Sequence, residues 1–253
     1  MNRAPSDASA PVYVYGAVRS GALSEVPREG IRDAPVELLE RDGLGLLVST
    51  VPVEGLRVRR QDLLRHLRLI EDVFAQTTVV PCSFGTVVAS REAADAYLLE
   101  ERRDELLELL LRLDGRSQLN VKIAYDEEHA LKEIVAAEPE IARLREVTRR
   151  LGAAAYYENL RLGELIAAAL AARRARDADD FLERLAACAE DVVVEESRDE
   201  TLILKASFLI GRRRLDAFNE ELERLAANEA PRVRVESIGP LPPTAFVSLG
   251  TET

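Results

Sequence analysis

Side chains suited to acid–base or metal chemistry are scarce in this chain of 253 residues, which has only two histidines. His66 follows Asp62 by four residues, and His129 lies in an acidic run that begins at Asp126. Neither HExxH nor GxSxG occurs, so a histidine metal cluster or a Ser-His-Asp triad would need residues that converge from remote segments. We therefore expect no catalytic residue, no bound metal, no cofactor and no enzymatic activity.

The composition is typical of a folded cytosolic protein. Cys82 and Cys188 form no CxxC pattern, which favours two small buried thiols in a reducing compartment. The net charge of −11 opposes binding to nucleic-acid phosphates. Residues 1–10 lack an apolar signal segment, and no apolar run approaches the ~18 residues of a membrane span. We expect a disordered tail at 1–10, no export and no membrane span.

Three consecutive arginines are candidates for partner binding. Arg212, Arg213 and Arg214 stand at the start of an expected helix, where positive charges oppose the helix dipole. The run is either a solvated helix start or the docking point of an acidic partner.

The proline-rich C-terminal segment supplies further candidates. Residues 239–243 should adopt extended polyproline geometry, which is ordered before docking. The segment could dock on its own domain or on a partner, and the apolar residues after it need burial. Pro240, Leu241 and Phe246 are therefore also candidate partner-binding residues.

Apolar spacing predicts the elements of the N-terminal half. Residues 12–18 have the β-branched and aromatic content of a central strand, and Asp42-Gly43 between two strand-like runs predicts a hairpin. A helix over 59–76 should bury one apolar stripe. That stripe consists of Leu63, Leu67, Ile70 and Phe74.

Long helices dominate the expected second half. Residues 140–176 contain no proline and follow an approximate heptad pattern, which predicts one long helix in which Gly152 and Gly163 mark close packing or a kink. Asp177 can cap a shorter helix, so a helical hairpin should follow. The last helix should bury one stripe, formed by Leu215, Phe218, Leu222 and Leu225.

The order strand, strand, helix, strand occurs once in each half of the chain. This parallel predicts an α+β fold with two ferredoxin-like domains, each containing a ββαβ unit, joined by the long helix and the helical hairpin. We expect an N-terminal α/β domain at 11–125. The C-terminal α+β domain, with its long helices and proline-rich tail, should cover 126–253.

Four motifs in this order resemble the gas vesicle protein F/L family, and together they span nearly the whole chain. They are Tyr13 to Gly16, Val80 to Thr86, Ala206 to Ile210 and Gly239 to Val247. The last motif is usually Gly-Pro-Trp-Pro-Pro-Tyr-Ser-Phe in the family. In place of Trp, Tyr and Ser, this chain has Leu241, Thr244 and Ala245.

The resemblance implies a non-enzymatic accessory or minor structural protein of the gas vesicle, located there and in the cytoplasm. It would contact the small hydrophobic shell protein during assembly, together with other gas vesicle accessory proteins. An acidic protein with sheet edges and amphipathic helices can cover such an apolar client. The alternative is a cytosolic ferredoxin-like sensor module that binds a small ligand between its domains.

Overall fold

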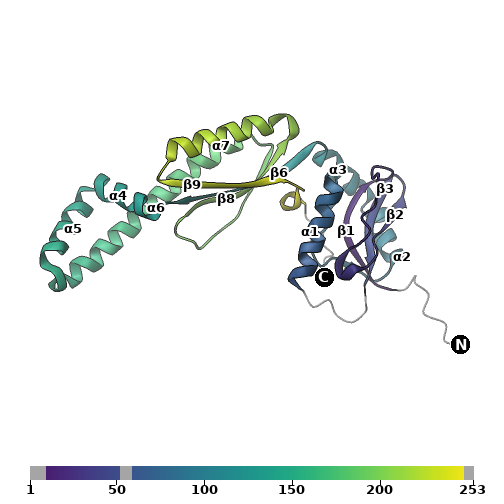
Figure 1. Ribbon diagram of the computed structural model, residues 1–253, viewed down its shortest axis with the longest axis horizontal. Helices are drawn as coiled ribbons and strands as arrows, with labels where there is room; N and C mark the ends of the chain where they lie inside the picture. The colour runs from purple at the N-terminus through teal and green to yellow at the C-terminus, as the bar shows by residue number, and fades with distance from the viewer. Residues whose placement is uncertain (1–9, 52–58, 248–253) are drawn as a thin grey trace. The chain divides into compact units, whose positions relative to one another are not determined.

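A computed structural model describes residues 10–51 and 59–247 and shows a mixed α/β protein with two antiparallel sheets (Figure 1). The chain divides into two compact units. Unit 1 comprises Met1–Gln118 and Pro240–Thr253, and unit 2 comprises Leu119–Gly239. The sequence places a boundary after residue 125, whereas the strand that ends there pairs with two strands from the second half of the chain. Long-range strand pairing therefore moves the division upstream and returns the C-terminal tail to unit 1.

The sheet of unit 1 has the strand order β2-β3-β1-β4, and β5 also pairs with β1. β1 is central, as predicted, and its residues 12–18 are buried. The predicted hairpin joins β2 to β3, where Asp42 and Gly43 have φ of +46° and +86°, as a two-residue type I′ turn requires. The strands are β1 (Val12–Arg19), β2 (Glu37–Arg41), β3 (Leu44–Thr50), β4 (Val80–Pro81) and β5 (Val87–Val88).

Helix α1 of unit 1 buries a different face from the one predicted. Ile70 is buried as expected, but Leu63 and Leu67 are 36% and 39% exposed, so the predicted stripe is wrong at these positions. Asp62 and His66 are buried on α1 instead: His66 lies 3.0 Å from the hydroxyl of Tyr13, and Asp62 lies 3.8 Å from Arg32, too far for a hydrogen bond. The helical elements are η2 (Ile31–Asp33), α1 (Arg60–Phe74), α2 (Arg91–Ala94), the π-helical η3 (Asp95–Glu101), α3 (Arg103–Leu113) and η6 (Thr244–Phe246).

The sheet of unit 2 has the strand order β7-β8-β6-β9. Helices α6 and α7 contribute to its core, where the rings of Phe208 and Phe218 lie 5.1 Å apart. Phe218, Leu222 and Leu225 are buried, which confirms the stripe predicted for the last helix. The strands are β6 (Arg116–Tyr125), β7 (Asp191–Val194), β8 (Leu202–Gly211) and β9 (Val233–Leu241).

The long helix predicted over 140–176 is in fact a helical hairpin. Helix α5 ends at Leu151, Gly152 adopts a φ of +57°, and α6 then runs back for 31 residues (Figure 1). No separate helix begins at Asp177, because α6 continues through it. Asp126 caps a helix that the sequence analysis missed, α4, by accepting a hydrogen bond from the backbone N–H of His129. The helices are α4 (Glu127–Ala137), α5 (Pro139–Leu151), η4 (Gly152–Ala154), α6 (Tyr156–Ala186), η5 (Arg212–Arg214) and α7 (Leu215–Glu229).

Helices α4 and α5 pack against α6 at one end of unit 2. We call α4, α5 and residues 156–170 of α6 the helical arm. The rest of α6 packs in the core of the sheet, through residues such as Phe181 and Leu185. The arm is therefore attached to the sheet through α6 and through α4, which follows β6 directly.

Candidate interaction surfaces

A buried polar cluster lies between α1 and β1 in unit 1. The hydroxyl of Tyr13 lies 3.0 Å from Nδ1 of His66 and accepts a hydrogen bond from the backbone N–H of Gly85, which leaves the hydroxyl hydrogen for the histidine. Burial lowers the pKa of His66 to about 4 and raises the pKa of Tyr13, so both groups are neutral at pH 7. Asp62 faces Arg32 across 3.8 Å. These contacts hold α1 on the sheet and enclose His66.

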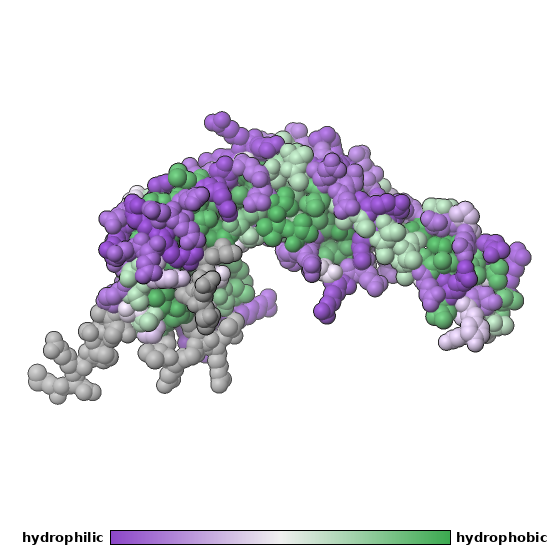
Figure 2. All heavy atoms as spheres, turned by 180° about the vertical axis from the view of Figure 1, so that it is seen from behind, coloured by the Kyte–Doolittle hydropathy of each residue, from purple (hydrophilic) through white to green (hydrophobic). Residues whose placement is uncertain are grey.

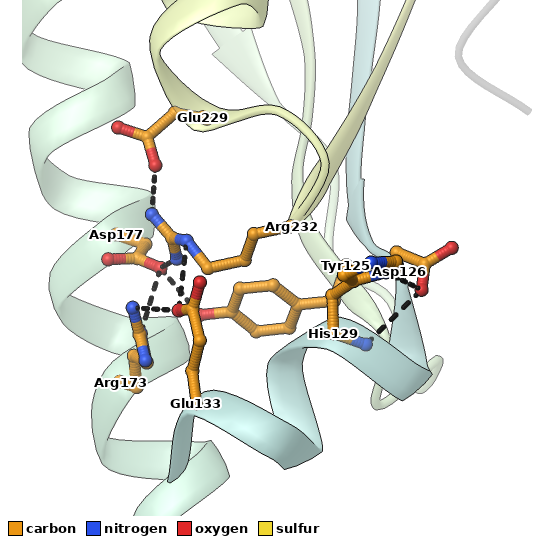
Figure 3. Close-up of polar contacts among 8 residues, drawn as sticks. All are labelled: Tyr125, Asp126, His129, Glu133, Arg173, Asp177, Glu229 and Arg232. Carbon is orange, nitrogen blue, oxygen red and sulfur yellow. Dashed lines mark hydrogen bonds and ion pairs between the residues drawn. The ribbon is translucent and has the colours of Figure 1, made fainter. Parts of the chain in front are cut away.

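A second polar cluster fixes the base of the helical arm (Figure 3). The guanidinium of Arg232 pairs with Asp177 and Glu229, lies 3.6 Å from Glu133, and sits 5.8 Å from the ring centre of Tyr125. Burial by itself lowers the pKa of Arg232, but Asp177 and Glu229 outweigh it and leave the pKa raised. Side chains from α4, α6, α7 and β6 thus meet at one buried cation, which gives the cluster a structural role.

The second histidine pairs with an acidic neighbour, and neither cysteine forms a disulfide. Nδ1 of His129 is 2.8 Å from Asp126 (Figure 3), and a hydrogen bond from Arg234 lowers the pKa of Asp126. Cys82 and Cys188 are free thiols. Within residues 10–51 and 59–247, no three His, Cys, Asp or Glu side chains gather as a metal site would require.

The structure separates the three candidate arginines of η5. Arg214 donates a 2.9 Å hydrogen bond to the carbonyl of Ala187, just after the end of α6. Arg212 and Arg213 are exposed, and no ion pair or hydrogen bond engages their side chains among the residues that the structure describes. Two of the three arginines are therefore available for a partner.

Strand β7 lies beside this arginine pair, because the start of β7 pairs with the end of β8. β7 is at the edge of its sheet, and its Val193 and Val194 are 36% and 52% exposed. We call β7 together with Arg212 and Arg213 the β7 edge. An edge strand with exposed apolar residues can pair with a strand of another protein. The run of three valines in β7 is the sequence signal for this surface.

The C-terminal candidates fall in unit 1, and they differ in burial. Phe246 is 7% exposed, and its carbonyl accepts a 2.5 Å hydrogen bond from Arg112. The side chain of Gln118 accepts a 2.9 Å hydrogen bond from the backbone N–H of Ala245. Pro240 is exposed and Leu241 is partly buried. Phe246 therefore packs in its own unit, while partner contacts by Pro240 and Leu241 stay a prediction.

A groove of about 270 Å³ lies between α6 and the β7–β8 hairpin in unit 2. Arg174, Asp179, Glu195 and Lys205 are among its lining residues, and the last two form an ion pair of 2.5 Å. Small-molecule sites are usually larger, ~300–1,000 Å³, and mostly apolar. This groove therefore gives the sensor alternative no support.

The sequence analysis missed the exposed apolar residues where α5 turns into α6. Tyr156 and Tyr157 are 70% and 79% exposed. The turn at Gly152 places them at the closed end of the arm, where α5 and α6 meet. In the described parts of the chain, no helix has both the length and the apolar character to cross a membrane.

Comparison with known sequences identifies the relatives of this chain. The family model of gas vesicle synthesis protein GvpL/GvpF matches residues 11–248. Gas vesicle protein F of Streptomyces sp. (strain CB03234) is 38% identical over 240 residues, which are 93% of this chain and 98% of that relative. Gas vesicle protein L of the same strain is 30% identical over 270 residues, covering 95% and 94% of the two chains.

Solved structures show the same fold. The crystal structure of GvpF from Anabaena sp. PCC7120 aligns with a TM-score of 0.79 over 96% of this chain and all of that one, at 24% identity. GvpF from Microcystis aeruginosa aligns with a TM-score of 0.73 over 95% of this chain and all of that one, also at 24% identity. Motifs, family match and fold agree, so this chain belongs to the GvpL/GvpF family of gas vesicle synthesis proteins.

Proposed function

We propose that this protein supports gas vesicle assembly by binding the small hydrophobic shell protein. The family match over nearly the whole chain is the observation that carries the proposal. The higher identity to the Streptomyces protein F, 38% against 30% for protein L, favours an F-type role. The protein acts by binding and not by catalysis, at the gas vesicle in the cytoplasm, and other gas vesicle accessory proteins are further partners.

The β7 edge is the surface that we propose for the shell protein. Main-chain groups along the free side of β7 can pair with an added strand, and Val193 and Val194 offer apolar contact. Arg212 and Arg213 add positive charge beside the strand, and in the described chain neither has an ion pair that would have to break first. A strand that pairs with this edge cannot pair at the same time with another copy of the shell protein, so the edge could prevent premature self-association.

We propose further that both units are ferredoxin-like. The two sheets have equivalent strand orders, β2-β3-β1-β4 and β7-β8-β6-β9. In each, a ββαβ run supplies three of the strands in this order, as the sequence parallel predicts, and unit 1 adds β5 beside β1. Residues 31–33 form only a short 3₁₀ turn where unit 2 has its helical arm.

Co-purification of the shell protein with the full-length chain tests this function. Binding should occur at low salt and weaken at high salt, because the arginine contacts are screened. Val194→Lys, which places a charge on the exposed edge, and the double variant Arg212→Ser/Arg213→Ser should each reduce it. Ile238→Ser is the matched control, since Ile238 is 65% exposed on the opposite edge strand, β9.

Two results would count against this account. If the wild-type chain retains no shell protein at low salt, the proposed function is wrong. If shell protein is retained equally by wild type, Val194→Lys and the arginine variant, the protein still binds its client, but the β7 edge is the wrong surface.

A further inference from the structure

Large apolar side chains gather at the closed end of the helical arm. Val147, Leu151, Tyr156, Tyr157 and Leu160 are 37%, 49%, 70%, 79% and 55% exposed. Figure 2 shows green and pale side chains among purple ones at this end of the molecule. Single exposed apolar residues are ordinary on protein surfaces, whereas a group of them around one turn marks an interaction site.

Part of this group belongs to a longer apolar face of α6. Tyr156, Leu160, Gly163 and Ala167 recur at intervals of four, three and four residues, so they share one side of the helix, and all four are exposed. The same spacing continues to Phe181, which packs in the core of unit 2. The side of α6 that packs on the sheet near Phe181 is therefore exposed to solvent near Tyr156. Its helical spacing and small residues suit close packing of a second helix.

The charges around the closed end of the arm indicate the charge of the helix that would pack there. Residues 140–161 contain five arginines and three glutamates, a net charge of +2 in a chain whose net charge is −11, and Arg161 forms an ion pair with Glu140. Arg149 and Arg150 share one carboxylate, that of Glu146, at 2.9 Å each. Arg143 is exposed and has no hydrogen-bond or ion-pair partner among the residues that the structure describes. Two copies of this surface would repel each other, whereas an acidic partner would be attracted.

We propose that the closed end of the helical arm docks an amphipathic helix of an acidic partner protein. The apolar side of that helix covers Tyr156, Leu160 and the small residues beyond them, while its carboxylates face the arginines of α5. The rings of Tyr156 and Tyr157 lie 5.4 Å apart edge to face and supply rigid contact area. This surface goes beyond the proposed shell-protein contact and uses none of the residues of the β7 edge.

Two synthetic helical peptides test the proposal. They carry the same leucine stripe, flanked by glutamates in one and by lysines in the other, and their binding to the full-length chain is followed by fluorescence anisotropy. The glutamate peptide should bind, with an affinity that falls as salt rises, and the lysine peptide should not.

Variants then locate the binding site. Tyr156→Ser/Tyr157→Ser should weaken the glutamate peptide about tenfold or more, as loss of exposed aromatic anchors does. Arg149→Ser/Arg150→Ser should weaken it and flatten the salt dependence. Ile238→Ser, an equally exposed change on β9, should bind as wild type does. All of these positions are exposed, so melting temperatures should stay close to that of the wild type.

Several outcomes would overturn the proposal. One is equal binding of the two peptides, and another is wild-type affinity in the tyrosine variant. A dimer in sedimentation that the tyrosine variant abolishes would show that a second copy covers the surface. Adsorption to anionic lipid vesicles that needs the same tyrosines would show a membrane contact. Because no shell protein is present in these assays, their failure leaves the proposed function standing.

Discussion

Replacing Arg232 with alanine should loosen the helical arm at its base. The side chain is 11% exposed, and those of Asp177 and Glu229 are 19% and 20% exposed. Without the guanidinium, the carboxylates of Asp177 and Glu229 repel each other, and little solvent is present to screen this repulsion. Breaking a buried ion pair costs about 3–5 kcal/mol, and we expect ~3 kcal/mol because both carboxylates keep some exposure. The local opening equilibrium should therefore rise more than a hundredfold.

Hydrogen exchange read by mass spectrometry measures this opening segment by segment. In Arg232→Ala, exchange should accelerate in α4 and in the middle of α6 but not in unit 1. Arg234→Ala, two residues further along the chain on β9, is the matched control, because Arg234 is 72% exposed in its ion pair with Asp126, and it should leave exchange nearly unchanged. If α4 exchanges at the wild-type rate in Arg232→Ala, or if both variants behave alike, the buried cation does not hold the arm.

Three further predictions concern unit 1. His66 has a folded-state pKa of about 4, below its ordinary 6.5, so protons favour the unfolded chain, and stability should fall as the pH drops from 6.5 toward 4. Between pH 7 and 4.5, the wild type should lose about 2 kcal/mol more than His66→Asn in urea unfolding. Equal losses would mean that His66 is not buried as a neutral group. Phe246→Ala should lower the free energy of unfolding by about 3 kcal/mol, and Thr244→Ala, at an exposed position, by much less. Equal melting curves for the two variants would show that the C-terminal segment is not packed on unit 1. Leu69→Ala should lower the free energy of unfolding by about 2–4 kcal/mol because Leu69 is 2% exposed, and Leu67→Ala should lower it by less than ~1 kcal/mol. A larger loss in Leu67→Ala would instead support the buried stripe predicted from the sequence.

The sequence predicts the fold well where local pattern and tertiary packing agree. The Asp42-Gly43 hairpin is specified by its turn residues, and the stripe of α7 through Phe218 has a clean helical period. On α1, buried polar side chains override the pattern: His66 contacts Tyr13, Asp62 lies near Arg32, and Leu63 and Leu67 face outward. Such contacts join remote segments, which hydrophobic periodicity cannot anticipate.

The helical arm shows a second limit of the sequence. A heptad stripe describes one long helix and two antiparallel helices equally well, because both bury one apolar side. The deciding feature is the left-handed φ of Gly152, which reverses the chain. Gly152 was visible in the sequence as a point of packing or kinking, but reversal at that point depends on the contacts that α4 and α5 make with α6.

The candidate sites could be anticipated only in part. The arginine run at 212–214 is visible in the sequence, yet the bond from Arg214 to Ala187 requires the end of α6 to lie nearby. Phe246 is held by a hydrogen bond from Arg112, which lies far earlier in the chain. The edge position of β7 follows from strand order, which is a property of the whole sheet.

The gas vesicle content of the host after deletion of this gene tests the central claim most directly. Cells are compared by electron microscopy with the wild type and with a strain in which the intact gene is returned. A role in assembly predicts that vesicles are lost or strongly reduced in the deletion strain and restored by the returned gene. Vesicles of normal number and form in the deletion strain would contradict a role for this protein in their formation.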